Sequence, residues 1–344
     1  IYVLLILLLG VQAIGMAQVD STRIDSVVID STMLVPVELP PEKSSAERTA
    51  DSQDQPKELF KVTPWEFHAP LTSDVVATDS TLRWQYWPDW SYKLNREPGI
   101  ISYRLGTSIR TNAVQRDAHE PRHQQLYWEG ISLNDPVSGT LDWSLIPQHK
   151  ISEFYSEELG VQHRSSYYQH QYYLNKPLSR LLYSESKFSF RNLEFEVSHN
   201  LSQRTNVELS YWDRRTGGEF PNSEITGRQI YGKISHHLDQ NRYLKLNYLN
   251  NNYDIGQPFG YSIPNLRNYN FDRFTTMANQ SRGRSQETSS LLALNYYQRS
   301  PDTTQAVDNL HAGIFYQGSE RSLTYTADTT RYKVQSAGAN AAKW

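Results

Sequence analysis

The sequence predicts a mainly β protein: a small α/β domain followed by an antiparallel transmembrane β-barrel, of which about eight strands are present. From Lys187 onward, apolar and polar residues alternate with a period of two, which is the period of side chains along a strand. The mean hydropathy is only −0.65, yet the chain contains 23 Tyr and 8 Trp. This combination suits a barrel with a wet interior and aromatic girdles.

The alternating region 185–344 is interpreted as the N-terminal part of the barrel. Short turns and longer loops are expected to alternate along it, and charged and amide residues fill every second position, as on the wet face of an outer-membrane barrel. The strands of a soluble β-sandwich would also alternate apolar and polar residues, but short and long loops need not follow one another regularly in a sandwich. The strand-like runs are centred on Leu193–Val197, Val207–Tyr211, Ile230–Leu238, Leu244–Tyr248, Leu292–Tyr296, Leu310–Tyr316, Leu323–Tyr325 and Tyr332–Val334.

The first 85 residues are predicted to lie outside both folded parts. Residues 1–14 form an apolar run of signal-peptide length, and the small residues Gly15 and Ala17 predict cleavage after Ala17. No basic segment or initiator Met precedes the run, so we expect a partial signal peptide (1–17) and a sequence incomplete at its N-terminus. A buried or membrane-anchoring helix is the alternative. Residues 18–85 carry too little apolar surface to offset their ordering entropy and predict a disordered periplasmic linker.

The sequence nominates no residue for catalysis. It contains no phosphate-binding Gly loop, zinc-binding helix motif or Gly-x-Ser-x-Gly elbow, so we expect neither an enzyme nor a cofactor. The absence of cysteine excludes disulfides and thiolate catalysis, and the net charge of −3 gives no reason to expect nucleic-acid binding. His119 and His123 flank Pro121, which argues against one helical face and hence against a metal site. Asp135 and Asp142 fit turn and cap positions better than an acid–base pair.

The stretch Leu126–Phe154 combines short apolar runs with turns that have a physical cause. Glycine permits positive φ, Asn and Asp bind their own backbone, and Pro fixes φ. Together with an upstream Tyr92–Ile100 segment, the order and spacing resemble the plug domain of TonB-dependent outer-membrane receptors over about residues 90–160. The matching residues are Pro98, Gly99, Glu129, Gly130, Asn134, Asp135, Pro136, Gly139, Asp142, Ile146 and Pro147.

This resemblance implies a plug-like domain over residues 86–180 and a location in the outer membrane of a Gram-negative bacterium. It also implies three kinds of partner: TonB with its inner-membrane motor complex, an extracellular small solute, and outer-membrane lipid. The sequence departs from the family pattern at four points. The family's Asp-Gly is Glu129-Gly130, and its Arg-Gly is split by Leu105. No Arg precedes Gly160, and no Gly- and Ala-rich return strand follows it.

One segment of the linker resembles a TonB box, the short β-prone stretch that adds a strand to TonB. Its physics would be β-augmentation, in which backbone hydrogen bonds supply the affinity. The alternative is a β-branched patch that belongs only to the repetitive linker. The segment is Asp25, Ser26, Val27, Val28 and Ile29.

The segment 250–287 is expected to be a long outer loop rich in aromatic and amide side chains. Such side chains stack on and hydrogen-bond a ligand such as a glycan or a siderophore. A self-packed loop with girdle aromatics is the alternative. The candidate ligand-contacting residues are Tyr253, Phe259, Tyr261, Tyr269 and Phe271.

The predicted function is uptake of a scarce solute, such as a siderophore or glycan, by a TonB-dependent-receptor-like transporter. A passive porin or structural barrel with a vestigial plug stays open, and so does a secreted β-sandwich binding module. Barrels of about eight strands have room only for side chains, whereas those of the family have about 22. Either the sequence is truncated, then, or the plug resemblance is false. Trp344 fits a native barrel end, but residues 336–343 make a poor apolar face, which favours truncation.

Overall fold

In a computed structural model the chain divides into two units, Ile1–Lys57 and Glu58–Trp344. All residues that the structure describes belong to the second unit. They are 74–78, 90–96, 98–103, 113–117, 119–135, 139–141, 143, 150–159, 162–172, 176–262, 276–299 and 309–343. The predicted signal peptide and most of the predicted linker lie outside this described part.

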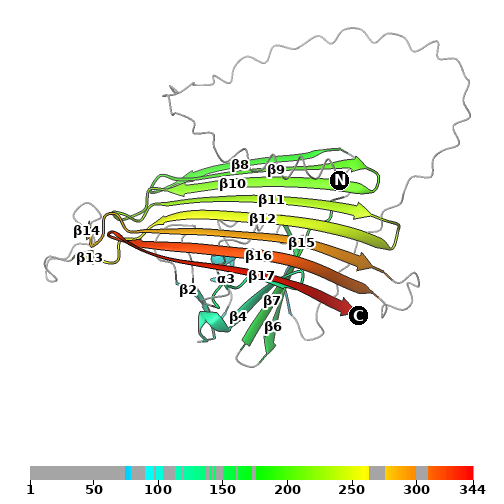
Figure 1. Cartoon of the computed structure of the whole chain (residues 1–344), viewed down its shortest axis with the longest axis horizontal. Helices are drawn as coiled ribbons and strands as arrows, with labels where there is room; N and C mark the ends of the chain where they lie inside the picture. The colour runs from blue at the N-terminus through cyan, green and yellow to red at the C-terminus, as the bar shows by residue number, and fades with distance from the viewer. Residues whose placement is uncertain are drawn as a thin grey trace, which may run out of the picture. The chain divides into compact units, whose positions relative to one another are not determined.

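Eight antiparallel strands form one large sheet, in which each strand pairs with its neighbours along the chain (Figure 1). A short hairpin of β13 (Tyr261–Ser262) and β14 (Met277–Ala278) lies in the connection between β12 and β15. The sheet is open, with β8 at one edge and β17 at the other. Its strands are β8 (Leu178–Ser186), β9 (Phe190–Ser202), β10 (Thr205–Thr216), β11 (Ile225–His237), β12 (Arg242–Gly256), β15 (Arg284–Gln298), β16 (Leu310–Tyr325) and β17 (Asp328–Lys343).

The large sheet buries polar side chains on one face and exposes apolar side chains on the other. In β9, Asn192, Glu196 and Ser198 are almost fully buried, whereas Leu193 and Phe195 between them are 38% and 41% exposed. A soluble sheet does the reverse, because its apolar face packs on the core. Strands of a membrane barrel need this arrangement, since lipid covers their apolar face. The exposed apolar face continues through Leu181, Tyr183, Leu209, Leu292, Leu294, Ile314 and Tyr316.

The predicted number of strands is confirmed, but two predicted positions are wrong. Leu323–Tyr325 is the end of β16 and not a separate strand, because the polar run 317–322 continues the strand with polar residues on both faces. The first strand of the sheet, β8, begins at Leu178, ahead of the predicted boundary at residue 185. Its consecutive Leu181 and Leu182 break the alternation that reveals the other strands.

The connections sort by length less cleanly than the sequence predicts. The end of the sheet that carries the long connection 257–283 also carries two tight ones, residues 187–189 and 326–327. Residues 299–309, at the opposite end, join β15 to β16 by a longer path than the turn between β9 and β10. Loop length therefore supports a membrane barrel less strongly than the apolar and polar faces of the sheet do.

A small domain (residues 74–172) precedes the large sheet. Its own sheet has the order β1-β6-β7-β4-β5, with β4 parallel to β7 and the other pairs antiparallel. Its first strand lies within the stretch that the sequence assigned to a disordered linker, because the run Asp-Val-Val-Ala-Thr pairs with β6. The elements are β1 (Asp74–Thr78), α3 (Trp90–Leu94), β2 (Ile100–Tyr103), β3 (Ala113–Arg116), η2 (Pro121–His123), β4 (Gln124–Trp128), β5 (Ile131–Ser132), β6 (Ile151–Leu159) and β7 (Gln162–Gln169).

Among the described residues, no helix combines the length and the apolar character that crossing a bilayer requires.

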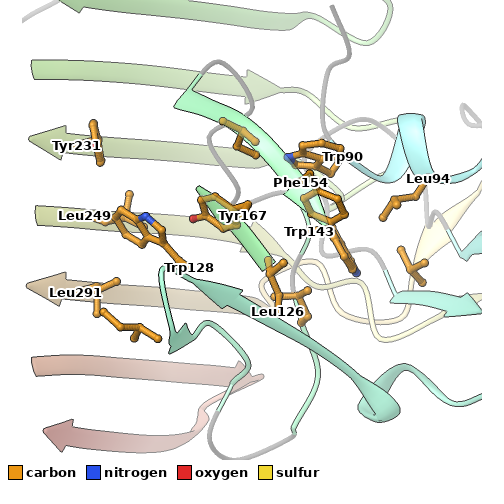
Figure 2. Close-up of a cluster of buried hydrophobic side chains, with 14 of the residues drawn as sticks. Trp90, Leu94, Leu126, Trp128, Trp143, Phe154, Tyr167, Tyr231, Leu249 and Leu291 are labelled. Carbon is orange, nitrogen blue, oxygen red and sulfur yellow. The ribbon is translucent and has the colours of Figure 1, made fainter. Parts of the chain in front are cut away.

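The small domain and the large sheet share one hydrophobic core (Figure 2). Trp90 of α3 stacks on Phe154 of β6 with ring centroids 4.7 Å apart. Trp128, the last residue of β4, lies 6.1 Å from the ring of Tyr231 in β11. This core joins the two parts across the wet face of the large sheet. The large sheet contributes Tyr231, Leu249, Leu291 and Ala293.

Candidate functional site: the contact between the small domain and the large sheet

The turn Glu129-Gly130 connects β4 to β5 and places the Glu129 carboxylate against side chains of the large sheet. Both residues have positive φ, 49° and 85°, as a two-residue hairpin turn of the primed kind requires. Glu129 is only 2% exposed. Its carboxylate forms an ion pair with Lys245 of β12 and accepts a hydrogen bond of 3.0 Å from the Tyr297 hydroxyl. The Asn340 amide of β17 donates to the Glu129 carbonyl at 3.1 Å. A hairpin of the small domain therefore contacts three strands.

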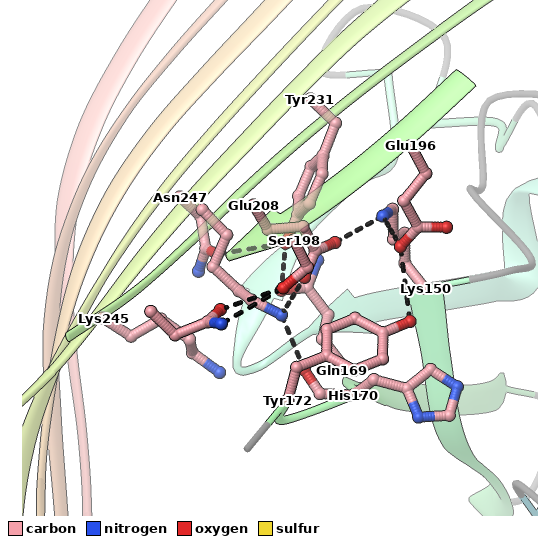
Figure 3. A network of polar contacts seen from close by, with 12 residues as sticks. Lys150, Gln169, His170, Tyr172, Glu196, Ser198, Glu208, Tyr231, Lys245 and Asn247 are labelled. Atoms are coloured by element: carbon pink, nitrogen blue, oxygen red, sulfur yellow. Dashed lines mark hydrogen bonds and ion pairs between the residues drawn. The ribbon is translucent and has the colours of Figure 1, made fainter. Parts of the chain in front are cut away.

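A second charged contact centres on Lys150, the residue before β6 (Figure 3). Its ammonium, 1% exposed, forms ion pairs with Glu196 of β9 and Glu208 of β10. Lys233 of β11 lies 2.7 Å from the other Glu208 oxygen and donates to the His170 carbonyl at 2.6 Å. The two lysines thus match the two carboxylates in charge. Such a cluster tolerates burial only while it is complete, because each ion lost leaves another without a counter-charge.

Neutral hydroxyls complete this contact. Burial, with the Glu196 and Glu208 carboxylates next in effect, raises the pKa of the Tyr172 hydroxyl. The hydroxyl therefore stays protonated and donates to Glu196 at 3.3 Å. From the large sheet, the Tyr231 hydroxyl donates to the Gln169 amide oxygen at 2.7 Å. Hydrogen bonds thus run in both directions between the small domain and the strands.

Asn134 and Asp135 of the plug-like motif hold the loop that follows β5. The Asn134 amide donates to the carbonyls of Gln124 and Gly139 at 2.7 and 2.9 Å, and its oxygen accepts from the Leu126 backbone at 3.0 Å. Gly139 adopts φ 69° and donates its backbone N–H to the Asp135 carbonyl at 2.8 Å. These contacts give the loop the hydrogen-bonded turns that its composition predicts.

Other residues of the motif lie apart from this contact or outside the described part of the chain. Pro98 is exposed, and Gly99, with φ 74°, accepts a backbone hydrogen bond from Asp117. The structure does not describe Pro136, Asp142, Ile146 and Pro147, nor the TonB-box segment 25–29.

The three described aromatic residues among those assigned to a ligand-binding loop each pack against a different ring. Tyr253 lies within β12, buried against Trp212 at 5.9 Å, so its assignment to a loop is wrong. The run of three Asn before it resembles a loop, but it continues the strand. Phe259 packs edge-on against Tyr325, and Tyr261 of β13 lies against Phe220. Tyr269 and Phe271 fall outside the described residues.

A cavity of about 110 Å³ lies between the small domain and the large sheet. Asn134 and Asp135 line it from one side, and Glu287, Arg321 and Tyr332 line it from the other. The Tyr332 hydroxyl donates to the Asp135 carboxylate at 3.3 Å, and Arg321 lies 3.0 Å from Glu287. Glu287 and Arg321 are near the strand ends that carry the 257–283 connection. The cavity thus has both polar and apolar lining residues and lies near the long connection.

Of the charged residues that join the two parts, Glu129 was among the sites predicted from the sequence, but its partners and the second cluster were not. Glu208, Lys233 and Lys245 are far apart in the chain, and only their positions on the polar face of alternating strands give a signal; Lys150, which precedes β6, gives none. The sequence shows which charged residues lie on the polar face of a strand, but it does not show which residue of the small domain each one pairs with.

Comparison with known proteins finds likeness in structure alone. No protein-family model and no curated protein sequence matches the chain. The siderophore receptor PirA from Acinetobacter baumannii superposes with a TM-score of 0.58 at 10% identity, over 78% of this chain and 44% of PirA. The FrpB iron transporter from Neisseria meningitidis (F3-3 variant) gives 0.60 at 12% identity, over 79% of this chain and 45% of FrpB.

A Serratia marcescens structure, of a double mutant of the hemophore receptor HasR with its hemophore HasA and heme, gives a TM-score of 0.57 at 12% identity. It is covered over 41% of its length, and this chain over 79%. The chain thus spans less than half the length of these three structures. The described part of the chain has the mainly β fold of these outer-membrane receptor barrels.

Proposed function

We propose that the chain belongs to a TonB-dependent-receptor-like outer-membrane transporter that takes up a scarce solute such as a siderophore or a glycan. In this proposal β1 and residues 86–177 are the plug, and residues from Leu178 onward are part of the barrel wall, so the expected plug boundary at residue 180 moves to the start of β8. The solute would enter from the extracellular side, and TonB with its inner-membrane motor would displace the small domain. The proposal concerns the whole protein, and the experiments below use the full-length protein.

The observation that carries this proposal is the position of the small domain on the polar, buried face of the large sheet. The opposite face exposes large apolar side chains such as Leu181 and Ile314, at 70% and 60%. A sheet with lipid on one face and a folded domain on the other has its lumen filled by that domain. The contact combines ion pairs and hydrogen bonds with the shared hydrophobic core. If the small domain left the sheet, its polar groups would exchange their partners for water, which suits a domain that has to move.

Deletion of Asp25–Ile29 tests coupling to TonB. We expect uptake of the solute to fall to the level of a strain without TonB, because β-augmentation of this segment would be lost. Binding of the solute to the cells should persist. Deletion of residues 43–47, from the same linker, is the matched control and should leave uptake intact. Unchanged uptake after the first deletion would remove TonB from the proposed mechanism.

A passive porin or structural barrel with a vestigial plug is the second candidate, favoured by the missing Arg before Gly160. A reversible cross-link separates the two. A Cβ placed on Gly130 would lie 3.9 Å from the Asn340 Cβ, inside the range of about 3.5–4.5 Å found in disulfides. The chain contains no native cysteine to interfere.

For the double variant Gly130→Cys/Asn340→Cys, we expect oxidation to stop import and reduction to restore it, because the oxidised hairpin cannot leave β17. Each single variant is a control, and Gly130→Cys also reports the strain of a side chain at φ 85°. Uptake is measured with ferric siderophores and oligosaccharides that the unaltered protein imports. Equal flux in the oxidised and reduced double variant would favour the porin.

A further inference from the structure

His163, the second residue of β7, is a buried imidazole without a hydrogen-bond partner. Its side chain is 4% exposed, and neither ring nitrogen has a hydrogen bond. Leaving a buried polar group unpaired costs on the order of 1–3 kcal/mol, so such groups nearly always have a partner. A neutral imidazole has a lone pair that a metal ion can bind.

Two carboxylates face the two nitrogens of this ring at equal distances. The Asp117 Oδ2 atom lies 4.0 Å from Nε2, and the Glu158 Oε1 atom lies 4.0 Å from Nδ1. These separations are too long for hydrogen bonds. One ligand atom from each of the three residues lies within 4.8 Å of the others. One ion binds only one nitrogen of an imidazole, and ligands around a tetrahedral ion with bonds of about 2 Å are roughly 3.3 Å apart. Rotation of the exposed Asp117 and Glu158 side chains would therefore have to bring both carboxylates to the same nitrogen.

A second histidine is close enough to join them. The ring centroid of His119 lies 5.8 Å from that of His163, and two imidazoles on one zinc ion have centroids roughly 5 Å apart, given Zn–N bonds of about 2.0 Å. The backbone N–H of His119 donates to the Arg116 carbonyl at 2.8 Å, which places His119 in a turn directly after β3. Asp117, in the same turn, adopts φ 48°. The turn therefore presents a carboxylate and an imidazole towards β7.

The surrounding charge is compatible with a cation. Asp117 and Glu158 carry two negative charges, and Arg116 offsets one of them. The Arg116 guanidinium also donates to Ser156 at 2.9 Å, which directs part of its charge away from the cluster. Imidazole with carboxylate is a donor set that suits zinc and its neighbours, whereas Ca²⁺ and Mg²⁺ prefer oxygen alone.

We propose that His163, Asp117 and Glu158, with His119 as the fourth donor, bind a divalent first-row transition metal, of which Zn²⁺ is the representative. The site is separate from the contact with the large sheet. Gln169, which contacts Tyr231, is six residues further along β7, or about 20 Å at the rise of a strand. The metal would tie the turn after β3 to the β6–β7 hairpin. The site does not depend on the proposed transport function.

The test is Zn²⁺ binding to the full-length protein in detergent, measured by isothermal titration calorimetry. We expect one Zn²⁺ per chain with a dissociation constant in the micromolar range. Asp117→Asn, Glu158→Gln and His163→Gln should each weaken binding by about tenfold or more, since each removes a ligand. Co²⁺ should give visible absorption bands that Zn²⁺ displaces, which reports nitrogen and oxygen ligation directly.

Matched controls isolate the site. Glu157→Gln changes the carboxylate next to Glu158, whose side chain points to the opposite face of β6, and His199→Gln changes an exposed histidine of β9. Both should bind Zn²⁺ as the unaltered protein does. Asp117 and Glu158 are 49% and 67% exposed, so their variants keep the test valid if His163→Gln fails to fold. Absence of Zn²⁺ binding, or equal affinity in Asp117→Asn and Glu157→Gln, would overturn the proposal.

Discussion

Replacement of Leu209 by arginine is expected to lower the free energy of unfolding in lipid vesicles by about 2–4 kcal/mol. Leu209 is 51% exposed on the apolar face of β10, between the buried Glu208 and Ser210. Its pairing partners, Val197 and Gly232, lie near the middle of their own strands. An arginine there would lie near the centre of the bilayer, where a charge is most costly. Unfolding by guanidinium chloride, followed by Trp fluorescence, measures the effect.

Leu201→Arg is the matched control for depth. Leu201 is 67% exposed on β9, close to the turn that leads to β10. Arginine near the membrane interface costs only about 0–1 kcal/mol. In a soluble sheet both substitutions would fall within roughly 0.5 kcal/mol, because surface changes rarely cost more. A small and equal effect at both positions would therefore rule out lipid on this face.

Glu208→Gln is expected to destabilise the protein by about 3–5 kcal/mol, because it leaves two buried lysines without their shared counter-charge. Glu208 is 1% exposed and pairs with both Lys150 and Lys233. Glutamine keeps the size of the side chain, so the effect reports charge and not packing. The same unfolding measurement gives its magnitude, and protease sensitivity of the small domain shows whether its docking is lost.

Glu185→Gln provides the comparison at the surface. Glu185 is 57% exposed and lies 3.5 Å from Arg191, a type of ion pair that contributes about 0–1 kcal/mol. If Glu208→Gln costs no more than Glu185→Gln, the buried ion pairs do not hold the small domain in place.

The sequence predicted most of the strands because a period of two is a local signal. The alternation of Leu193 and Phe195 with Glu194 and Glu196 reports both the strand and its faces. The signal failed wherever both faces are polar, as in the run of Asn before Tyr253, which was assigned to a loop. It failed also at β8, where two leucines are consecutive.

The candidate site was harder to predict because its partners are distant in the chain. The turn at Glu129 could be recognised from Gly130, but the lysine that pairs with Glu129 lies 116 residues further on. His119 was set aside since no helix could align it with His123, and indeed a short 3-10 turn lies there. Strand pairing, not local spacing, brings His119 beside His163. The pattern of residues along a single sequence does not show which distant strands pair.

The hydrogen bond from Asn340 to the Glu129 carbonyl has a consequence for how the protein assembles, since 211 residues separate its two ends. Closing so long a loop carries a large entropic cost that nearer contacts must first offset. We therefore expect β17 to meet the hairpin late, after the intervening strands have formed. Before those intervening strands have formed, Trp128 and its neighbours lack their cover, which leaves apolar surface exposed and makes the half-assembled chain prone to aggregation.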